Sequence, residues 1–314
     1  MSATPAEIAS TALEAAANAA WRQWGVLGAP VSAGGAEPEA VIDPEALILL
    51  SLALRGHERR LDDVLGWWAD AGAPLTSVQR VTTLGRRFPA SAREGLGAFA
   101  RSALESGDKR WSRHAREAAA LATRGKRGRE PRLTRGPALV LRLRAAFGVG
   151  LKADALAVLI ALGGTSLTAP ALSRTAGYNV AGVRRALLEM AAARVIETAG
   201  SARPAGYRAD VRGWSGLLGL DSAPGPAGTV RVRWRHFDQV FAFLAAVPAW
   251  AGDASSVSPY VAASRARDLF EAHRDAFALN RIEVPDPSGF PGPLYLEAFA
   301  AAVDILSRWL GENL

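Results

Sequence analysis

Residues 151–210, LKADALAVLIALGGTSLTAPALSRTAGYNVAGVRRALLEMAAARVIETAGSARPAGYRAD, decide the fold of this 314-residue chain. Apolar residues first recur at helical spacing, and Gly163-Gly164 ends that run. A second helical run ends at Gly177, and a third follows directly. The segment 194–198 then predicts a strand, followed by a tip with glycine and proline and a returning strand over 207–210. The stretch therefore predicts three helices and a two-stranded hairpin.

The boundaries of the second and third helices follow from local chemistry. Thr168 is placed to cap the second helix, and Gly177 supplies the positive φ that a tight bend between helices needs. The third helix spans about residues 180–193. Its apolar residues recur at three- and four-residue steps and predict a buried stripe of Val183, Ala186, Leu187 and Met190.

Burial of that stripe leaves the N-terminal end of the third helix exposed, the end that meets base edges when a helix-turn-helix docks in the major groove. Arginine pairs bidentately with guanine, and asparagine pairs with adenine. Arginines at the hairpin tip and on its returning strand would contact phosphates or the minor groove. In this unit we expect DNA contacts from Thr168, Arg174, Asn179, Ala181, Gly182, Arg184, Arg185, Arg203 and Arg208.

The run Gly182-Val183-Arg184-Arg185-Ala186-Leu187, followed by Met190-Ala191-Ala192-Ala193-Arg194-Val195-Ile196, resembles the winged helix-turn-helix regulators of bacteria in the style of the MarR and ArsR groups. The resemblance covers about 60 of the 314 residues. It implies a winged helix that binds duplex DNA in a transcriptional regulator, and a repressor within that class. Gly182 replaces a hydroxyl residue often found against DNA, and Arg194 replaces the usual glycine before the wing.

The charge distribution supports the same interpretation. The chain carries a formal net charge of +7, but residues 101–213 alone carry +13, and each flank carries −3. A basic region over a helix-turn-helix pattern is the expected electrostatic footprint of a DNA-binding protein. The basic stretch 124–132 predicts either a solvated hinge or an arm whose Lys126, Arg127 and Arg129 contact phosphates.

Alanine is abundant and strand-forming residues are sparse, so the chain is predicted to be mostly α-helical, with the winged helix between two helical domains. Asp43-Pro44-Glu45 predicts a helix start, with Asp43 as N-cap and Glu45 in the first turn. The predicted parts are an N-terminal helical domain 1–108, a basic linker 109–135, a DNA-binding domain 136–213, a linker 214–228 and a C-terminal helical domain 229–314.

Winged-helix regulators typically bind two-fold sites as dimers, so we expect a homodimer on double-stranded DNA. The aromatic-rich C-terminal helices are the favoured dimer surface. The alternative is an antitoxin or adaptor that holds a protein partner through the acidic flanks and uses the winged helix for docking.

Composition and motifs argue against most enzyme classes. The chain has no cysteine and four scattered histidines, so no metal site, cofactor site or catalytic residue is predicted. The weaker alternative is a HEPN-like ribonuclease, because Arg231 and His236 have the Arg-x4-6-His spacing of that family. No apolar run is long enough to span a membrane, and we expect a soluble cytoplasmic protein associated with the nucleoid.

Overall fold

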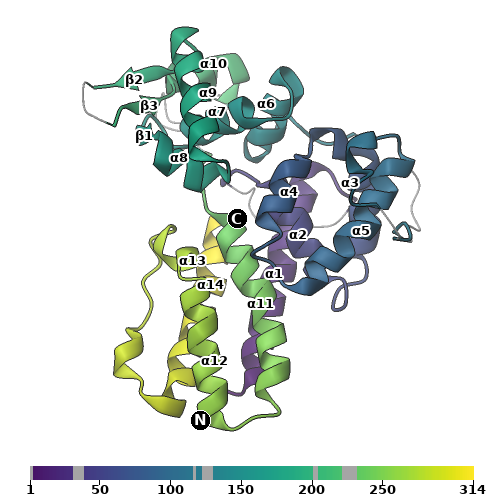
Figure 1. The fold of residues 1–314 in the computed structure, drawn as a ribbon, viewed down its shortest axis with the longest axis vertical. Helices are drawn as coiled ribbons and strands as arrows, with labels where there is room; N and C mark the ends of the chain where they lie inside the picture. Colours follow the sequence, from purple (N-terminus) through teal and green to yellow (C-terminus); the bar gives the residue numbers. More distant parts are fainter. Residues whose placement is uncertain (1–2, 31–38, 116–117, 122–129, 201–203, 221–231) are drawn as a thin grey trace.

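The computed structural model describes residues 3–30, 39–115, 118–121, 130–200, 204–220 and 232–314. Within these residues the chain forms fourteen α-helices and one small antiparallel sheet of three strands (Figure 1). The prediction of a mostly α-helical protein is confirmed. Five short 3-10 turns also occur: Ala73–Leu75, Lys109–Trp111, Gly136–Ala138, Pro287–Gly289 and Gly292–Leu294.

The N-terminal helices are α1 (Pro5–Leu27), α2 (Pro44–Leu54), α3 (Leu61–Ala71), α4 (Val78–Leu84) and α5 (Ala90–Glu105). Their starts follow capping rules. Asp43 caps α2, since its carboxylate accepts a hydrogen bond from the Ala46 N–H, and Ser77 caps α4 in the same way through the Arg80 N–H. The expected helix start at Asp43 is thus confirmed.

The central elements are α6 (Leu139–Phe147), α7 (Leu151–Ala161), β1 (Leu167–Thr168), α8 (Ala169–Ala176), α9 (Val180–Ala192), β2 (Glu197–Ala199), β3 (Gly206–Arg208) and α10 (Val211–Leu218). In the sheet, β3 lies between β1 and β2, with Tyr207 opposite both Leu167 and Thr198. The two residues of β1 are too few for a periodic signal, and this strand was not predicted.

Two local features in the central region differ from the sequence prediction. The first strand of the hairpin begins at Glu197 because Arg194 adopts φ 55° and turns the chain. This is the left-handed conformation that glycine adopts more readily than other residues. Residues 211–218 form α10, capped by Asp210 and ended by Gly219 at φ 58°, although residues from 214 onward were expected to be a linker.

The C-terminal helices are α11 (Phe237–Ala254), α12 (Pro259–Ala272), α13 (Asp275–Ala278) and α14 (Tyr295–Asn313). Helix α11 continues through Pro248, a residue type that usually kinks or ends a helix. Proline removes one backbone N–H, but Val247 and Trp250 on either side are buried against neighbouring helices. Tertiary packing therefore maintains the helix.

The buried apolar residues form two clusters. One comprises α7, α8, α9 and parts of α6, the sheet and α10. The other contains the N-terminal and C-terminal helices together, because α1 packs against α11 and α14 (Figure 1). The two flanking regions thus share one core, although the sequence predicted a separate helical domain on each side.

Candidate nucleic-acid interface

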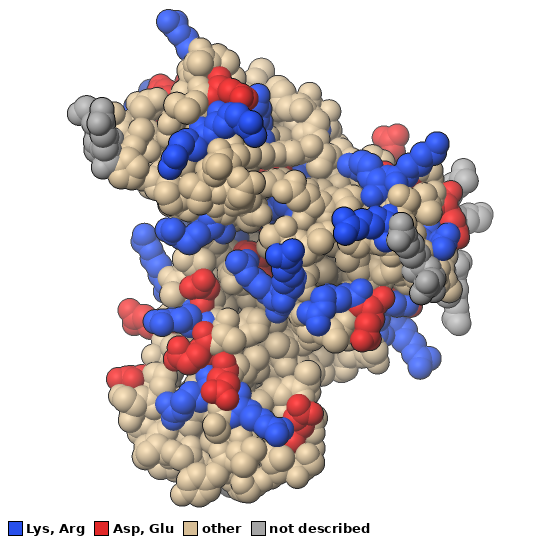
Figure 2. Space-filling view, in the orientation of Figure 1, with Lys and Arg blue, Asp and Glu red and all other residues tan. Residues whose placement is uncertain are grey.

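Basic side chains are unevenly spread over the surface. Figure 2 shows Lys and Arg gathered across the middle of the molecule, whereas the acidic side chains lie mainly over the lower, C-terminal helices. This distribution of charge agrees with the sequence, in which the central region carries a net positive charge and each flank a net negative charge. Which of these cations are free to meet a polyanion depends on their partners in the structure.

The α8–turn–α9 unit has the local geometry that its sequence predicts. The Thr168 hydroxyl accepts a hydrogen bond from the Ala171 N–H, and Gly177 has φ 73°. Asn179 caps α9, because its side-chain oxygen accepts a 2.7 Å hydrogen bond from the Gly182 N–H. Thr168 and Asn179, both expected to contact DNA, therefore have a structural role as helix caps.

The exposed side of α9 carries two arginines. Arg184 and Arg185 are exposed and have no ion pair with a described carboxylate, as is also true of Arg174 on α8. Ala181 is exposed, and Gly182 is half-buried beside the Asn179 side chain. The four residues predicted for the buried stripe of α9 are all buried.

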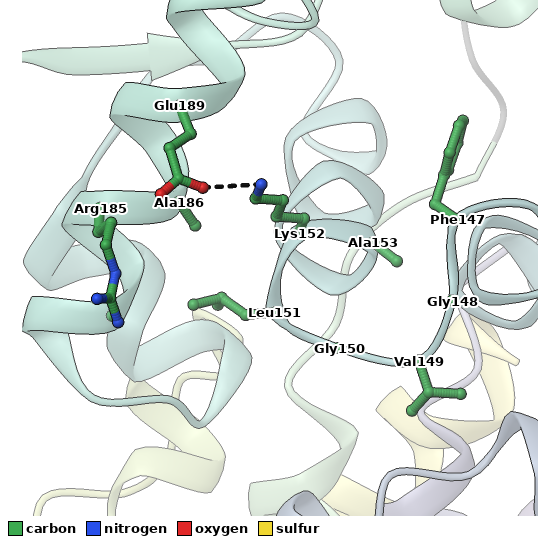
Figure 3. A pocket seen from close by; sticks show the side chains of 11 residues that line it. Phe147, Gly148, Val149, Gly150, Leu151, Lys152, Ala153, Arg185, Ala186 and Glu189 are labelled. Atoms are coloured by element: carbon green, nitrogen blue, oxygen red, sulfur yellow. Dashed lines mark ion pairs between the residues drawn. The ribbon is translucent and has the colours of Figure 1, made fainter.

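A groove of about 340 Å³ separates α9 from the loop between α6 and α7 (Figure 3). Gly182, Arg185, Ala186 and Glu189 line it from α9, and Phe147 to Ala153 line it from the other side. The Lys152 ammonium crosses the groove to the Glu189 carboxylate at 2.7 Å. This hydrogen bond lowers the pKa of Glu189. Lys152 is therefore partly neutralised beside the arginines of α9.

The hairpin presents less free positive charge than its sequence suggests. The Arg208 guanidinium lies 2.8 Å from the Glu197 carboxylate on the adjacent strand, and both side chains are about half exposed. Arg203 at the tip lies outside the described residues, as do Lys126, Arg127 and Arg129 of the basic stretch.

A buried ionic network lies beneath the α8–α9 turn and was not predicted. At its centre the Arg144 guanidinium uses all five N–H donors. It contacts both Glu45 oxygens at 2.6 and 3.0 Å, both Asp154 oxygens at 2.7 and 2.8 Å, and the Leu75 carbonyl at 2.9 Å. Both Arg144 and Glu45 are fully buried. Because every donor is used, the geometry of α2, α6 and α7 around this arginine is tightly specified.

A second arginine carries the network to the helix-turn-helix unit. Arg80, in α4, contacts the Asp43 carboxylate at 2.6 Å and the Glu45 carboxylate at 2.5 Å. Its Nε donates to the Ala176 carbonyl at the end of α8, at 2.9 Å. Burial alone would lower the pKa of Arg80, but Asp43 and Glu45 raise it above its ordinary value. The guanidinium therefore stays charged and fixes α4 to the turn.

Tyr178 completes the network from the turn itself. Its hydroxyl donates a 2.7 Å hydrogen bond to Asp154 Oδ2, on α7. Burial and the Asp154 charge raise the pKa of Tyr178 above its ordinary value. Burial alone would raise the pKa of Asp154, but the Arg144 guanidinium brings it below its usual range. The position of the turn is thus fixed from two sides, by Arg80 and by Asp154.

The Arg231 and His236 pair can be placed only in part. Arg231 lies outside the described residues. His236 precedes α11, where its backbone N–H donates to the Asn280 side chain, and burial lowers its pKa to about 4. Among the described residues, no group of three or more His, Asp or Glu side chains could hold a metal ion.

No protein-family model, curated protein or solved structure matches this chain. In the described part of the chain, no helix combines the length and the apolar character needed to cross a membrane.

Proposed function

We propose that residues 136–213 form a winged helix-turn-helix that binds duplex DNA, and that the protein is a transcriptional regulator. The order α7, β1, α8, α9, β2, β3 supports this proposal, because three helices followed by an antiparallel hairpin are the elements of a winged helix. In such a unit α9 would enter the major groove, and the β2–β3 hairpin would lie beside it as the wing.

The observation that carries the proposal is the exposed pair Arg184 and Arg185 on α9, neither of which forms an ion pair with a carboxylate of the described residues. An arginine on a helix in the major groove can donate two hydrogen bonds to a guanine. Arg174, exposed on α8, would contact a phosphate. Lys152 and Arg208 would contribute less, because each already contacts a glutamate.

The first experiment is selection from a pool of random duplex DNA by mobility shift over a salt series, followed by sequencing of the bound fraction. A recovered two-fold motif with retention near physiological salt would support a sequence-specific dimeric regulator. Binding that vanishes with salt and yields no motif would restrict the role to electrostatic packaging of DNA. Absence of binding at every salt concentration would reject the proposal in favour of a protein-docking module.

Alanine substitutions then test whether α9 is the helix that recognises the DNA sequence. Arg184→Ala and Arg185→Ala should each weaken binding by about 1–3 kcal/mol where the arginine contacts a base, with relaxed preference at one position of the motif. Arg265→Ala and Arg308→Ala, exposed arginines on α12 and α14, serve as matched controls and should leave affinity unchanged. If all four variants bound DNA as tightly as the parent does, α9 would not be part of the DNA interface.

A homodimer that acts as a repressor is part of the same proposal, and the C-terminal helices are its expected dimer surface. Tyr260 and Val261 on α12, and Leu294 just before α14, are large apolar residues left exposed there. Sedimentation of the free protein and of its DNA complex measures the stoichiometry. One protomer per duplex with a selected two-fold motif would contradict the dimer.

A further inference from the structure

We propose that a duplex held by α9 continues across a second basic surface, formed by Arg86, Lys109, Arg113 and Arg174 and here named the α4 surface. This inference rests on the proposed DNA-binding function and extends it to a second contact region outside the winged helix. The partner at this surface is the sugar-phosphate backbone beside the recognised site.

Specific contacts bring together the segments that carry Arg86, Arg113 and Arg174, and Lys109 begins the short turn Lys109–Trp111 just before Arg113. Arg80 of α4 donates to the Ala176 carbonyl, two residues after Arg174 on α8. The α8–α9 turn also lies close to the end of α4, since a Cβ added at Gly177 would lie 3.6 Å from Leu84 Cδ2. Arg86 lies two residues after Leu84. On the other side of α4, the Thr82 hydroxyl lies 3.1 Å from the ring of His114, next to Arg113.

The cations of the α4 surface are available to a polyanion. All four are exposed, and none has an ion pair with a carboxylate of the described residues. The neighbouring Arg110 differs, because Asp108 and the Ala73 carbonyl hold its guanidinium. Figure 2 shows the band of basic side chains that crosses this part of the molecule, over α4 and α5.

The position of the surface favours DNA as its partner. Helix α9 begins at the turn against which α4 packs, so a duplex seated on the exposed side of α9 extends past α4 within one helical turn, about 34 Å. Backbone phosphates repeat along that length whatever the base sequence, and exposed arginines bind them without a fixed register. The α4 surface would therefore add affinity and leave sequence preference unchanged.

The test compares Arg86→Glu/Arg113→Glu with the parent on duplexes of 14 and 40 base pairs. Each duplex carries the selected site at its centre, or one fixed mixed sequence if selection recovers no motif. On the long duplex the double variant should bind about tenfold or more weakly, with a salt slope smaller by about 2, since each lost phosphate contact reduces the slope by about 1. On the short duplex the loss of affinity should be smaller, because fewer phosphates lie beside the centre of the site.

Two controls separate the possible failures. Arg265→Glu/Arg308→Glu reverses the same number of exposed charges on the C-terminal helices and should leave both affinities unchanged. Arg184→Ala/Arg185→Ala should weaken binding to both duplexes. Parent-like binding of Arg86→Glu/Arg113→Glu to the long duplex would overturn this inference while the DNA-binding proposal stands. No binding by the parent protein would overturn both.

Discussion

His236 and Asp238 lie two residues apart at the start of α11, and burial shifts their pKa values in opposite directions. Burial lowers the pKa of His236 to about 4 and raises that of Asp238 to about 6. The folded state therefore disfavours the charged form of each side chain. Acidification below the ordinary histidine pKa removes stability through His236, whereas acidification below pH 6 adds stability through Asp238.

Two variants should separate these opposing effects. Between pH 7.5 and 5, His236→Gln should gain about 1–2 kcal/mol in free energy of unfolding relative to the parent, because it lacks a group that must be protonated on unfolding. Over the same range Asp238→Asn should lose a similar amount relative to the parent. Urea denaturation at both pH values measures the differences. Variants that follow the parent at both pH values would contradict the assigned burial effects.

The Tyr178 hydroxyl makes one contact whose contribution can be isolated. Tyr178→Phe removes the 2.7 Å hydrogen bond to Asp154 and leaves the two contacts of Arg144 with that carboxylate. A hydrogen bond to a buried charged group contributes about 1–3 kcal/mol, so the variant should lose that much in free energy of unfolding. Tyr260→Phe is the control, because Tyr260 is 69 % exposed. Equal effects of the two changes would argue against a specific role for Tyr178.

At the scale of elements, Arg144 joins α2, α6 and α7 through Glu45, its own backbone and Asp154. Arg144→Lys keeps the charge but offers three donors in place of five, so at least one carboxylate oxygen loses its contact with residue 144. We expect a loss of about 2–4 kcal/mol in free energy of unfolding, against little change for Arg142→Lys on the same helix. Chemical denaturation measures the free energy of unfolding of both variants. An Arg144→Lys protein as stable as the parent would show that the five-donor geometry of the guanidinium is not needed for stability.

The helices could be predicted from sequence where their signals are local. The caps Asp43 and Thr168 and the positive φ of Gly177 depend on a few neighbouring residues, and each is confirmed. Pro248 shows the limit of such local signals, because α11 continues through it where packing maintains the helix.

The buried network could not be predicted, because its members are far apart in the sequence. Glu45 has the expected pattern of a first-turn charge exposed to solvent, yet it is fully buried between Arg80 and Arg144. The one available signal was the apolar sequence around each charge, such as LVLRLRAAF around Arg144. A pattern of this kind indicates burial but does not identify the partner.

At the scale of the whole molecule, the net charge of the central region overstates the positive charge that a polyanion could meet. Arg144 is buried, and Lys152 and Arg208 are paired with glutamates. Arg184 and Arg185 on α9 and the four cations of the α4 surface are exposed and have no ion pair with a described carboxylate. Sequence counts predicted the sign of the central charge, and the structure distinguishes the cations that are free from those that are paired.

The shared core makes a prediction about truncation. Removal of residues 1–27 deletes α1 and uncovers the apolar sides of α11 and α14, so the protein lacking them should aggregate or lose cooperative unfolding. A chain that starts at Thr4 keeps the capping box with Glu7 and should behave as the parent does. Size-exclusion chromatography and thermal unfolding compare the two. A monomeric 28–314 chain with the parent's Tm would show that α1 is peripheral.

The packing of α1 against α11 and α14 also constrains the order of events during synthesis. About 200 residues separate the end of α1 from the start of α11. At translation rates of about 5–20 residues per second, α1 waits roughly 10–40 s for its partner to be made. During that interval α1 can pack against α2, but the part of its apolar side that faces α11 and α14 has no native cover, whereas α7, α8 and α9 can pack soon after they emerge. Helices α7, α8 and α9 should therefore form their core before α1 completes its packing, and a chaperone that binds apolar helices would be expected to act on α1 in that interval.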